Sequence, residues 1–598
     1  MSLLRGLLKK PFVQVTCTPA RTISGEAGMC PLPQPENPCK IPRAKGLVLG
    51  MYTNPDDPFD VGSLTPTGQR YDAMVCHRVT DLMKYTYPPS KGQVRLFYNL
   101  DPEFSMVAVA GLGTNCQGYD VFEQMDEGKE AIRIASAHGC KALQKMGARK
   151  VYVESFGHAE SAAEGCALSV WLYQEKKNKK HQKYIPTIEL YDDCDWTGWQ
   201  IGLQKAAAQN LARQLMDCPS NMMTPTTFAQ NAVEVLCKSG INVEVKVRGW
   251  AETQKMNAFL AASQGSCEPP IFLELSYYGA CKDERPVVLI GKGITYNSGG
   301  ICLKPTNKQR YMRGDMAGAA CVVAACRAIA GLQLPINVRA LLPLCENMPG
   351  CAAMRPGDIV RAMNGKSIKI ESTDTAGRLC LADALVYAQN FWPRFIVDIG
   401  TMTNDMKHSI GASACGVWSN SEALWEYMLA ASMHTGDRVW RFPLWDHFTK
   451  LIAHHHAEDT KTFGRGGRPR CAEHNKVAAF LNEFVPCGDW LHIDSYGVMF
   501  TVGDDYPYLR RGMSGRPTRT LVEFLSQLQK YPWLKDPELD LPSIAKETEK
   551  LQHLKDLKEK LSKEFIKYGG LKPDIVQASQ QLAAIKEENR KINTQLHN

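Results

Sequence analysis

The sequence has no apolar run long enough to cross a membrane. Its longest, residues 316–326 (MAGAACVVAAC), would cover only about half of a bilayer and predicts a buried helix instead. We therefore expect no transmembrane segment and no membrane partner.

The 21 cysteines include no pair spaced as C-x-x-C. This absence argues against a zinc ribbon or a redox dithiol motif. We expect free thiols that pack as small apolar side chains in a reducing compartment.

Acidic residues are missing from the first 25 positions, which are basic and rich in hydroxyl groups. The basic residues there supply half of the net charge of +8, and they are Arg5, Lys9, Lys10 and Arg21. Leucines recur on one helical face of this segment, so residues 1–30 predict a mitochondrial transit peptide, with a basic tail as the alternative. The remaining chain is nearly neutral, and we expect no nucleic-acid partner.

From residue 45 onward, short apolar runs alternate with longer helical patterns, which predicts an α/β protein. We expect an N-terminal α/β domain (45–195), a linker helix (196–220) and a larger C-terminal α/β domain (221–529). Sites in such sheets lie where strands end and loops begin. The loops at 291–315, 372–378 and 400–404 are therefore the predicted place of any site.

Residues 530–598 have a different character and predict a helical, coiled-coil-like extension. Apolar residues recur there with the 3-4 spacing of three heptads, at Ile575, Ala578, Leu582, Ile585, Ile592 and Leu596, with Asn589 as a polar member of the seam. This helix would bind a protein partner or pack on its neighbour in the same chain.

Several long motifs occur in a fixed order: GKGITYNSGG, GDMAGAA, PLCENMPG, PGDIVRAMNGKSIKIESTDTAGRL and PYLRRGMSGRPTRTLVEFL. With these motifs the chain resembles the leucine aminopeptidase (cytosol aminopeptidase) family over about residues 45–527. The resemblance implies a two-domain α/β subunit, a homo-hexamer, and a site for two divalent ions, zinc or manganese, in the C-terminal domain.

The resemblance also implies a set of metal ligands, which this sequence keeps only in part. Lys292, Asp315 and Asp374 match the family's lysine and two of its aspartates. The family's aspartate in GITFDSGG is Asn297 here, and its glutamate in NTDAEGRL is Ala376. In the family these two lost carboxylates are shared between the metals.

Physical reasoning indicates that a metal pair would not survive this loss. Two dications about 3.5 Å apart repel by about 19 kcal/mol at an effective dielectric constant near 20. Four carboxylates offset that repulsion, whereas only two remain. We therefore expect no metal cofactor, or at most one weakly bound ion.

Two further catalytic positions of the family are retained. The resemblance implies that Lys304 would polarise the scissile carbonyl and that Arg378 would hold a bicarbonate. Without metals, we expect Lys292, Lys304 and Arg378 to pair instead with Asp315 and Asp374.

The substrate side is altered as well. The family's TLTG is TMTN here, with Thr401 kept and Asn404 in place of a glycine that lets the substrate backbone approach. Tyr496 replaces an alanine of the side-chain pocket, whose Met312 and Met499 are kept. A phenol ring would fill much of a pocket sized for leucine.

A histidine-rich stretch forms a separate candidate, with His454, His455, His456 and Glu458. Adjacent helical residues point in different directions, so these side chains would not meet at one ion. An exposed face or a subunit contact is the expectation.

These observations predict a catalytically degenerate leucine aminopeptidase homologue that serves as an assembly-forming structural protein. The pattern resembles the inactive sperm-leucylaminopeptidases of insects, which implies a mitochondrial place in sperm; cytoplasm or cytoskeleton is the alternative. Two rival hypotheses stay open: a residual single-metal aminopeptidase, and a peptide-binding module that does not cleave.

Overall fold

The computed structural model describes residues 44–53, 62–115, 118–191, 195–453, 459–462, 472–485, 488–503 and 506–528. These residues all belong to one compact unit, Met1–Lys530. The predicted leader (1–30), the predicted tail helices (530–598) and the histidine-rich stretch (454–458) lie outside the described residues. Among the described helices, none is both long enough and apolar enough to span a bilayer.

The N-terminal region is built on a six-stranded sheet of order β3-β4-β1-β7-β8, with β2 paired to β1. Strands β4, β1, β7 and β8 run parallel, and β3 and β2 are antiparallel to their neighbours. The strands are β1 (Lys45–Tyr52), β2 (Ser63–Leu64), β3 (Val94–Tyr98), β4 (Met106–Gly113), β7 (Lys150–Val153) and β8 (Thr187–Leu190); a separate small hairpin pairs β5 (Tyr119–Asp120) with β6 (Met125–Asp126).

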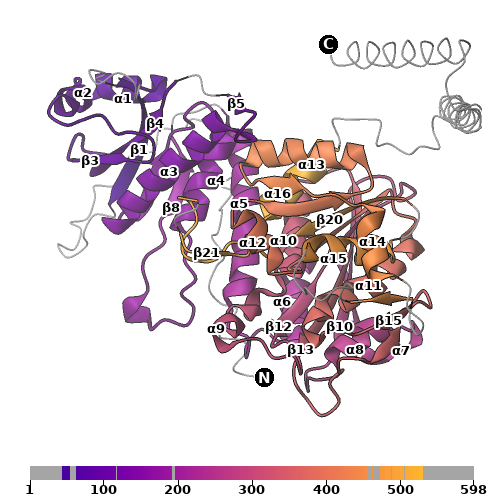
Figure 1. The fold of residues 1–598 in the computed structure, drawn as a ribbon. Coiled ribbons are helices and arrows are strands. Elements are labelled where there is room, and N and C mark those ends of the chain that lie inside the picture. Colours follow the sequence, from indigo (N-terminus) through magenta and orange to yellow (C-terminus); the bar gives the residue numbers. More distant parts are fainter. Residues whose placement is uncertain are drawn as a thin grey trace, which may run out of the picture. The chain divides into compact units, whose positions relative to one another are not determined.

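Helices cover both faces of this sheet (Figure 1). They are α1 (Pro66–Met74), α2 (Arg78–Met83), α3 (Glu127–Lys145) and α4 (Ala159–Val170). Val48 of β1 packs with residues of α3 and α4, whereas Leu47 and Leu49 pack with residues of α1 and α2. Because successive side chains of a strand alternate between faces, the continuous apolar run of β1 serves two cores at once.

The C-terminal region is built on a nine-stranded sheet of order β18-β17-β20-β16-β11-β13-β10-β9, with β12 paired to β13. The central strands β20, β16, β11 and β13 are parallel. The strands are β9 (Asn242–Val247), β10 (Ile271–Tyr278), β11 (Val287–Gly291), β12 (Gly293–Asn297), β13 (Asn337–Asn347), β16 (Phe395–Gly400), β17 (Cys415–Ser419), β18 (Val439–Arg441) and β20 (Asp489–Asp494).

A three-stranded sheet (β14-β15-β19), a two-stranded sheet (β21-β22) and a set of helices accompany this sheet. The remaining strands are β14 (Ile359–Arg361), β15 (Ser367–Lys369), β19 (Thr460–Lys461), β21 (Phe500–Thr501) and β22 (Gly512–Met513). The helices are α5 (Trp196–Asp217), α6 (Pro225–Cys237), α7 (Arg248–Thr253), α8 (Asn257–Ser263), α9 (Thr306–Gln309), α10 (Ala317–Gly331), α11 (Ala376–Ala388), α12 (Asp405–Ile410), α13 (Glu422–Thr435), α14 (Asp446–Ile452), α15 (Glu473–Asn482) and α16 (Thr518–Gln527).

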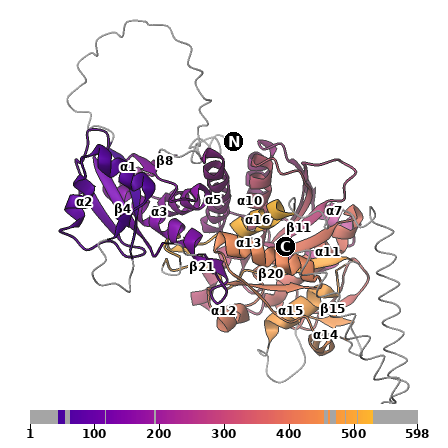
Figure 2. The same ribbon diagram turned by 90° about the horizontal axis from the view of Figure 1, so that it is seen from above.

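The large sheet is also covered on both faces, with α10 and α16 on one side and α11 and α15 on the other (Figure 2). Val288 and Ile290 of β11 pack in one cluster with residues of α11 and α15. Phe395 of β16 faces the other way and contacts Phe524 of α16, with ring centroids 5.9 Å apart. The predicted α/β class, with a smaller N-terminal and a larger C-terminal α/β region, is confirmed.

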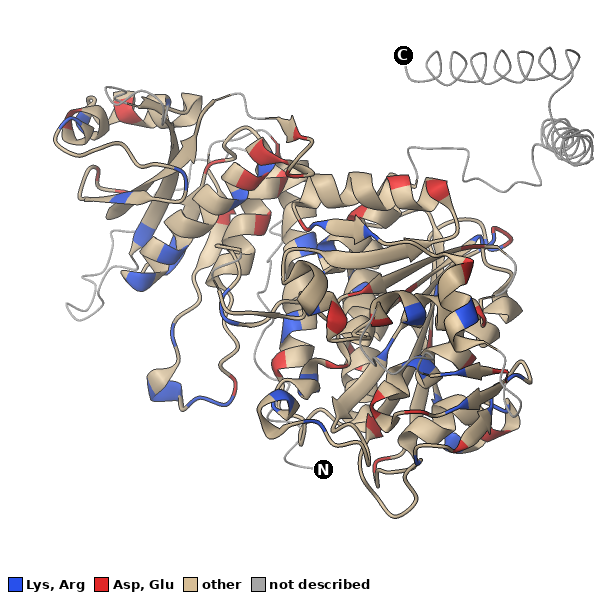
Figure 3. Ribbon diagram, in the orientation of Figure 1, with Lys and Arg blue, Asp and Glu red and all other residues tan. Residues whose placement is uncertain are grey.

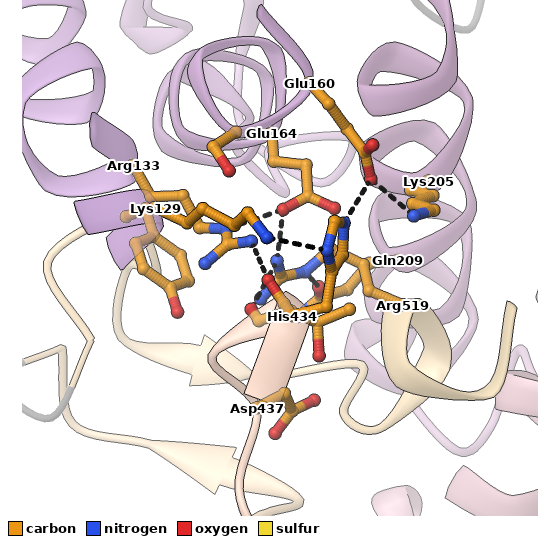
Figure 4. A network of polar contacts seen from close by, with 12 residues as sticks. Lys129, Arg133, Glu160, Glu164, Lys205, Gln209, His434, Asp437 and Arg519 are labelled. Carbon is orange, nitrogen blue, oxygen red and sulfur yellow. Dashed lines mark hydrogen bonds and ion pairs between the residues drawn. The ribbon is translucent and has the colours of Figure 1, made fainter. Parts of the chain in front are cut away.

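A buried ion network joins α3, α4 and α5 to α13 and α16 (Figure 4). Glu164 accepts hydrogen bonds from Arg133 Nε and Arg519 Nη1, both at 2.6 Å. Burial would raise the pKa of Glu164, but the charges of Arg519 and Arg133 outweigh it and hold the pKa below its usual value. Lys205 pairs with Glu160 and with Glu523. The N-terminal and C-terminal regions are therefore joined through charge pairs that are largely buried.

Basic and acidic residues occur throughout both α/β regions, and several lysines follow one another in one loop (Figure 3). This loop lies between α4 and β8 and contains Lys176, Lys177, Lys179, Lys180 and Lys183.

Candidate functional site

The ends of three central strands define the place of the candidate site. Lys292 follows β11, Thr401 follows β16, and Asn297 is the last residue of β12. Asp315 directly follows the short helical turn Met312–Gly314 and lies two residues before the start of α10. The Lys292 backbone N–H donates to Ile399 O at 2.9 Å, which holds the first two of these strand ends together.

Asp315 is the centre of the first group of contacts. Its Oδ1 accepts from Lys292 Nζ at 2.8 Å and from the Thr401 hydroxyl at 2.7 Å. Its Oδ2 accepts from Asn297 Nδ2 at 2.9 Å. Lys292 Nζ also donates to the Thr401 carbonyl oxygen. All of these residues are buried, so the carboxylate and the ammonium form a closed pair out of contact with water.

The orientation of the Asn297 amide follows from its neighbours. Its Oδ1 accepts from Gly299 N–H at 2.9 Å and from Asn347 Nδ2 at 2.8 Å. A backbone N–H only donates, so the oxygen must face Gly299 and the amide nitrogen must face Asp315. Gly299 has φ +96°, a left-handed conformation that favours glycine.

Lys304 and Asp374 form the second pair, with Nζ 2.5 Å from Oδ1. This pair is more open, because the Asp374 side chain is 37% exposed. Asp374 lies in the short turn Thr373–Thr375 that leads into α11. Two of the three expected lysine and arginine pairings are therefore present, Lys292 with Asp315 and Lys304 with Asp374.

The expected pairing of Arg378 with Asp315 or Asp374 is wrong. Arg378 Nη2 donates to Glu473 Oε1 of α15 at 2.7 Å, and Nη1 donates to the Thr462 carbonyl oxygen. Both Arg378 and Glu473 are buried, so each neutralises the other in a place that water does not reach. The sequence analysis missed Glu473.

Ala376 is the first residue of α11 and is fully buried. It belongs to the apolar cluster that also contains Leu379 and Cys380. The next residue, Gly377, leaves room for the lysine of the site, because a Cβ there would lie 2.4 Å from Lys292 Cε. Position 376 therefore offers no ligand atom. Its side chain packs in an apolar cluster, and the side chain of Lys292 lies against the next residue, Gly377.

The residues of the expected substrate pocket lie around the same centre. Met312 and Met499 are buried, and a Cβ at Gly314 would lie 3.6 Å from Met499 Sδ. Burial raises the pKa of the Tyr496 phenol well above its usual value, and the negative charges of Asp315 and Asp374 raise it further. The phenol is therefore protonated and close enough to both acids to feel their charge.

Asn404 has the right-handed conformation of a helix residue, with φ −62°. Its Nδ2 lies 3.1 Å from His408 Nε2, one turn further along α12. The Asn404 amide therefore lies along the surface of α12. The sequence analysis predicts only that this residue obstructs the substrate backbone.

Asp494, at the end of β20, is a further acid of the site that the sequence analysis missed. It accepts backbone hydrogen bonds from Met402, Thr403 and Tyr496. Burial raises its pKa to about 6, against the charge of His492 and these hydrogen bonds. The sequence signal that could have identified Asp494 as a site residue is its position at a strand end, directly before SYGVM.

The described side chains do not fit a pair of divalent ions. Lys292 Nζ donates to Asp315 Oδ1 and to the Thr401 carbonyl oxygen, so its hydrogens point at these two oxygens. The Asn297 oxygen already accepts two hydrogen bonds, and its amide nitrogen points at the acid that should bind metal. A metal site needs deprotonated ligands whose lone pairs point at the ion. Here the lone pairs of the Asp315 carboxylate accept hydrogens from Lys292 and Asn297 instead.

The fold has two α/β regions, and polar residues gather at the strand ends of the larger sheet. Family models of the cytosol aminopeptidase family match its N-terminal domain to residues 48–180 and its catalytic domain to residues 210–522. The chain therefore belongs to the cytosol aminopeptidase family.

Individual relatives agree with this assignment. The chain is 45% identical to a cytosol aminopeptidase of Rattus norvegicus over 490 residues, covering 81% of this chain and 93% of the relative. It is 44% identical to the cytosol aminopeptidase of Homo sapiens, covering 80% and 92%. Among solved structures, the bottromycin maturation enzyme BotP matches with a TM-score of 0.68 at 27% identity, covering 82% of this chain and 100% of BotP.

Proposed function

We propose that this chain is a catalytically degenerate member of the family that serves as an assembly-forming structural protein. The observation that carries the proposal is the contact between Asn297 and Asp315. An amide hydrogen, donated at 2.9 Å, stands where the family's pattern has a second carboxylate. A donor facing Asp315 satisfies that acid and removes the negative charge that two cations would need between them.

The charge balance of the site supports the same reading. The pairs Lys292–Asp315 and Lys304–Asp374 each sum to zero, and Ala376 adds no charge. Binding two dications would therefore place four positive charges in a neutral, largely buried site, or would require both lysines to lose a proton. Either route is unfavourable, because charge buried without a partner is strongly destabilising.

The residue at position 496 of the expected substrate pocket supports a loss of turnover that does not depend on the metals. The Tyr496 phenol lies within electrostatic reach of Asp315 and Asp374, where the family's pattern has only a methyl group. A leucyl side chain would have to displace this ring.

The proposed structural role includes a homo-oligomer, most simply a hexamer, as the resemblance to the family implies. Its support is the extent of the similarity, which covers 93% of the rat relative and so includes the surfaces remote from the metal ligands. A mitochondrial place in sperm is part of the proposal and is supported by the acid-free leader and by the loss of ligands.

A residual single-metal aminopeptidase is the second candidate, favoured by one observation. The Lys304–Asp374 pair is partly open to solvent, so Asp374 is accessible to an ion if Lys304 turns away. A peptide-binding module has no comparable observation in its favour.

Metal analysis separates these candidates. The purified protein is dialysed against zinc or manganese and then against metal-free buffer, and bound metal is measured by mass spectrometry of the elements. We expect well under one ion per subunit, and the matched control Asn297→Asp/Ala376→Glu should retain two. Two retained ions in the unaltered protein would refute the proposal, and one retained ion would favour the second candidate.

A further inference from the structure

Strand β9 (Asn242–Val247) is the end strand of the large sheet and, among the described strands, pairs only with β10. Every second residue of an edge strand turns its N–H and C=O away from the sheet, so β9 presents a row of unpaired donors and acceptors. Its valines are also open, since Val245 is 46% and Val247 is 62% exposed. We infer that β9 binds β9 of a second copy of this chain, antiparallel and centred on Val245, so that two large sheets join into one.

The sequence of β9, NVEVKV, is complementary to itself when two copies run antiparallel. With Val245 opposite Val245 of the second copy, Glu244 lies opposite Lys246, and Val243 lies opposite Val247. Opposite charges directly across from each other stabilise a strand pair, whereas like charges destabilise it. A parallel pair in register would place Glu244 opposite Glu244 and Lys246 opposite Lys246. The charges therefore select the antiparallel arrangement.

The lysine of β9 does not prevent this pairing. A lysine on an edge strand usually keeps copies apart, because its charge has no partner on the second strand. Here Lys246 Nζ lies 2.5 Å from Glu244 Oε2, two residues away on the same side of the strand. The Lys246 and Glu244 side chains are 22% and 43% exposed, so both remain within reach of a strand added at the edge. Each can exchange its partner within the strand for the same group on the second copy.

An open apolar groove lies beside this edge, between β9 and α6. It has a volume of about 380 Å³, and its lining includes the aliphatic side chains of Ala229, Val233, Val245 and Ile271. Because side chains alternate along a strand, the other two valines of β9 share the α6 side with Val245, and the two charged residues lie on the opposite side. The valines of an added β9 strand would extend the apolar side and cover the open side of the groove.

A second copy is the occupant that fits both the charges and the groove. A two-fold arrangement uses the same surface on both sides, so each charge pair and each valine contact outside the centre forms twice. Backbone hydrogen bonds between the two edges would supply the remaining contacts. The inference rests on the proposed assembly role and deepens it, because it names a surface through which copies bind.

Cysteine substitution in the full-length protein tests the register. In the inferred pair, the two Cβ atoms at position 245 lie about 5 Å apart across the two-fold axis. Val245→Cys should therefore form a disulfide between copies when diamide takes up the two electrons and two protons of the thiols. Val247→Cys is the matched control, because position 247 is more exposed but would lie about 14 Å from its equivalent in the second copy. We expect at least ten times more 245–245 link than 247–247 link, measured by mass spectrometry of the linked peptides.

Charge reversal in the Val245→Cys protein tests the partner. Glu244→Lys places like charges opposite each other and should reduce the 245–245 link at least tenfold. Adding Lys246→Glu reverses both charges, makes the strand complementary to itself again and should restore the link. A variant that only folds poorly would not be rescued in this way, and thermal unfolding of each variant provides a second check on folding.

Three results would overturn the inference. They are equal linking at positions 245 and 247, a 245–245 link that Glu244→Lys leaves unchanged, and a link from position 245 to a different cysteine, which would place another segment at the edge. Light scattering of the same samples separates this inference from the proposed function. A hexamer without the 245–245 link would refute only the contact through β9, and an unlinked monomer would refute the assembly role as well.

Discussion

Placing a glutamate at position 376 should destabilise the protein unless metal can bind. Ala376 is fully buried in an apolar cluster, so the new carboxylate would lie there without a dedicated partner. An uncompensated buried charge costs roughly 3–5 kcal/mol. We expect Ala376→Glu to lower the free energy of unfolding by about 3 kcal/mol, the lower end of this range. The reason is that Lys292 lies against the adjacent Gly377 and partly neutralises the new charge.

Adding Asn297→Asp to Ala376→Glu should make stability depend on metal. This double variant has four carboxylates, and manganese at 100 times its dissociation constant would stabilise the folded state by about 2.7 kcal/mol. Thermal and chemical unfolding with manganese and with a chelator measure the difference. The control Ala376→Gln has a similar size and no charge, so it reports the steric part alone and should not respond to manganese.

Two results would refute this reasoning. If Ala376→Glu is as stable as the unaltered protein in chelator, position 376 already has a counter-charge that the contacts do not reveal. If manganese stabilises the unaltered protein as much as the double variant, Asn297 and Ala376 do not prevent metal binding.

Four further predictions concern the pocket, the ion network (two of them) and the assembly. Adding Tyr496→Ala and Asn404→Gly to the metal-binding double variant should raise kcat/KM for leucyl substrates by a large factor; equal values with and without these changes would show that only ligands were lost. Glu164→Gln leaves Arg133 and Arg519 without their shared carboxylate and should lower the free energy of unfolding by about 3–5 kcal/mol, whereas Glu175→Gln, at the surface, should change it little. Because the folded-state pKa of Glu164 is depressed, its contribution is present above the unfolded-state pKa and is lost as the pH falls, so Glu164→Gln should flatten the acid limb of the stability curve. Light scattering at micromolar concentration should give the mass of a hexamer, and a monodisperse monomer would contradict the assembly role.

The sequence was sufficient for the fold and for the neighbourhood of the site, because both follow from local patterns. Apolar runs separated by helical patterns predicted the two α/β regions, and polar residues after strands predicted where side chains would gather. Lys292 and Asp315 are 23 positions apart, yet they meet because a strand end and a helix start converge at one edge of the sheet.

Contacts between distant segments were beyond the sequence analysis. Arg378 pairs with Glu473 of α15, which lies 95 positions later in the chain. No local sequence pattern distinguishes Glu473 from the acidic residues that lie on exposed helix faces. Asn347 was within a recognised motif, but its role as a donor to Asn297 depends on the pairing of β12 with β13, which places the two residues opposite each other. Asp494 was similarly hidden, because its burial decides its pKa and burial is a property of the whole sheet.

Hydrolysis of a leucyl-amide substrate, with zinc or manganese added, tests the proposed loss of catalysis most directly. The purified protein should release product no faster than its Lys304→Ala variant, which lacks the lysine paired with Asp374. Metal-dependent turnover that is present in the unaltered protein and absent from Lys304→Ala would contradict the proposal.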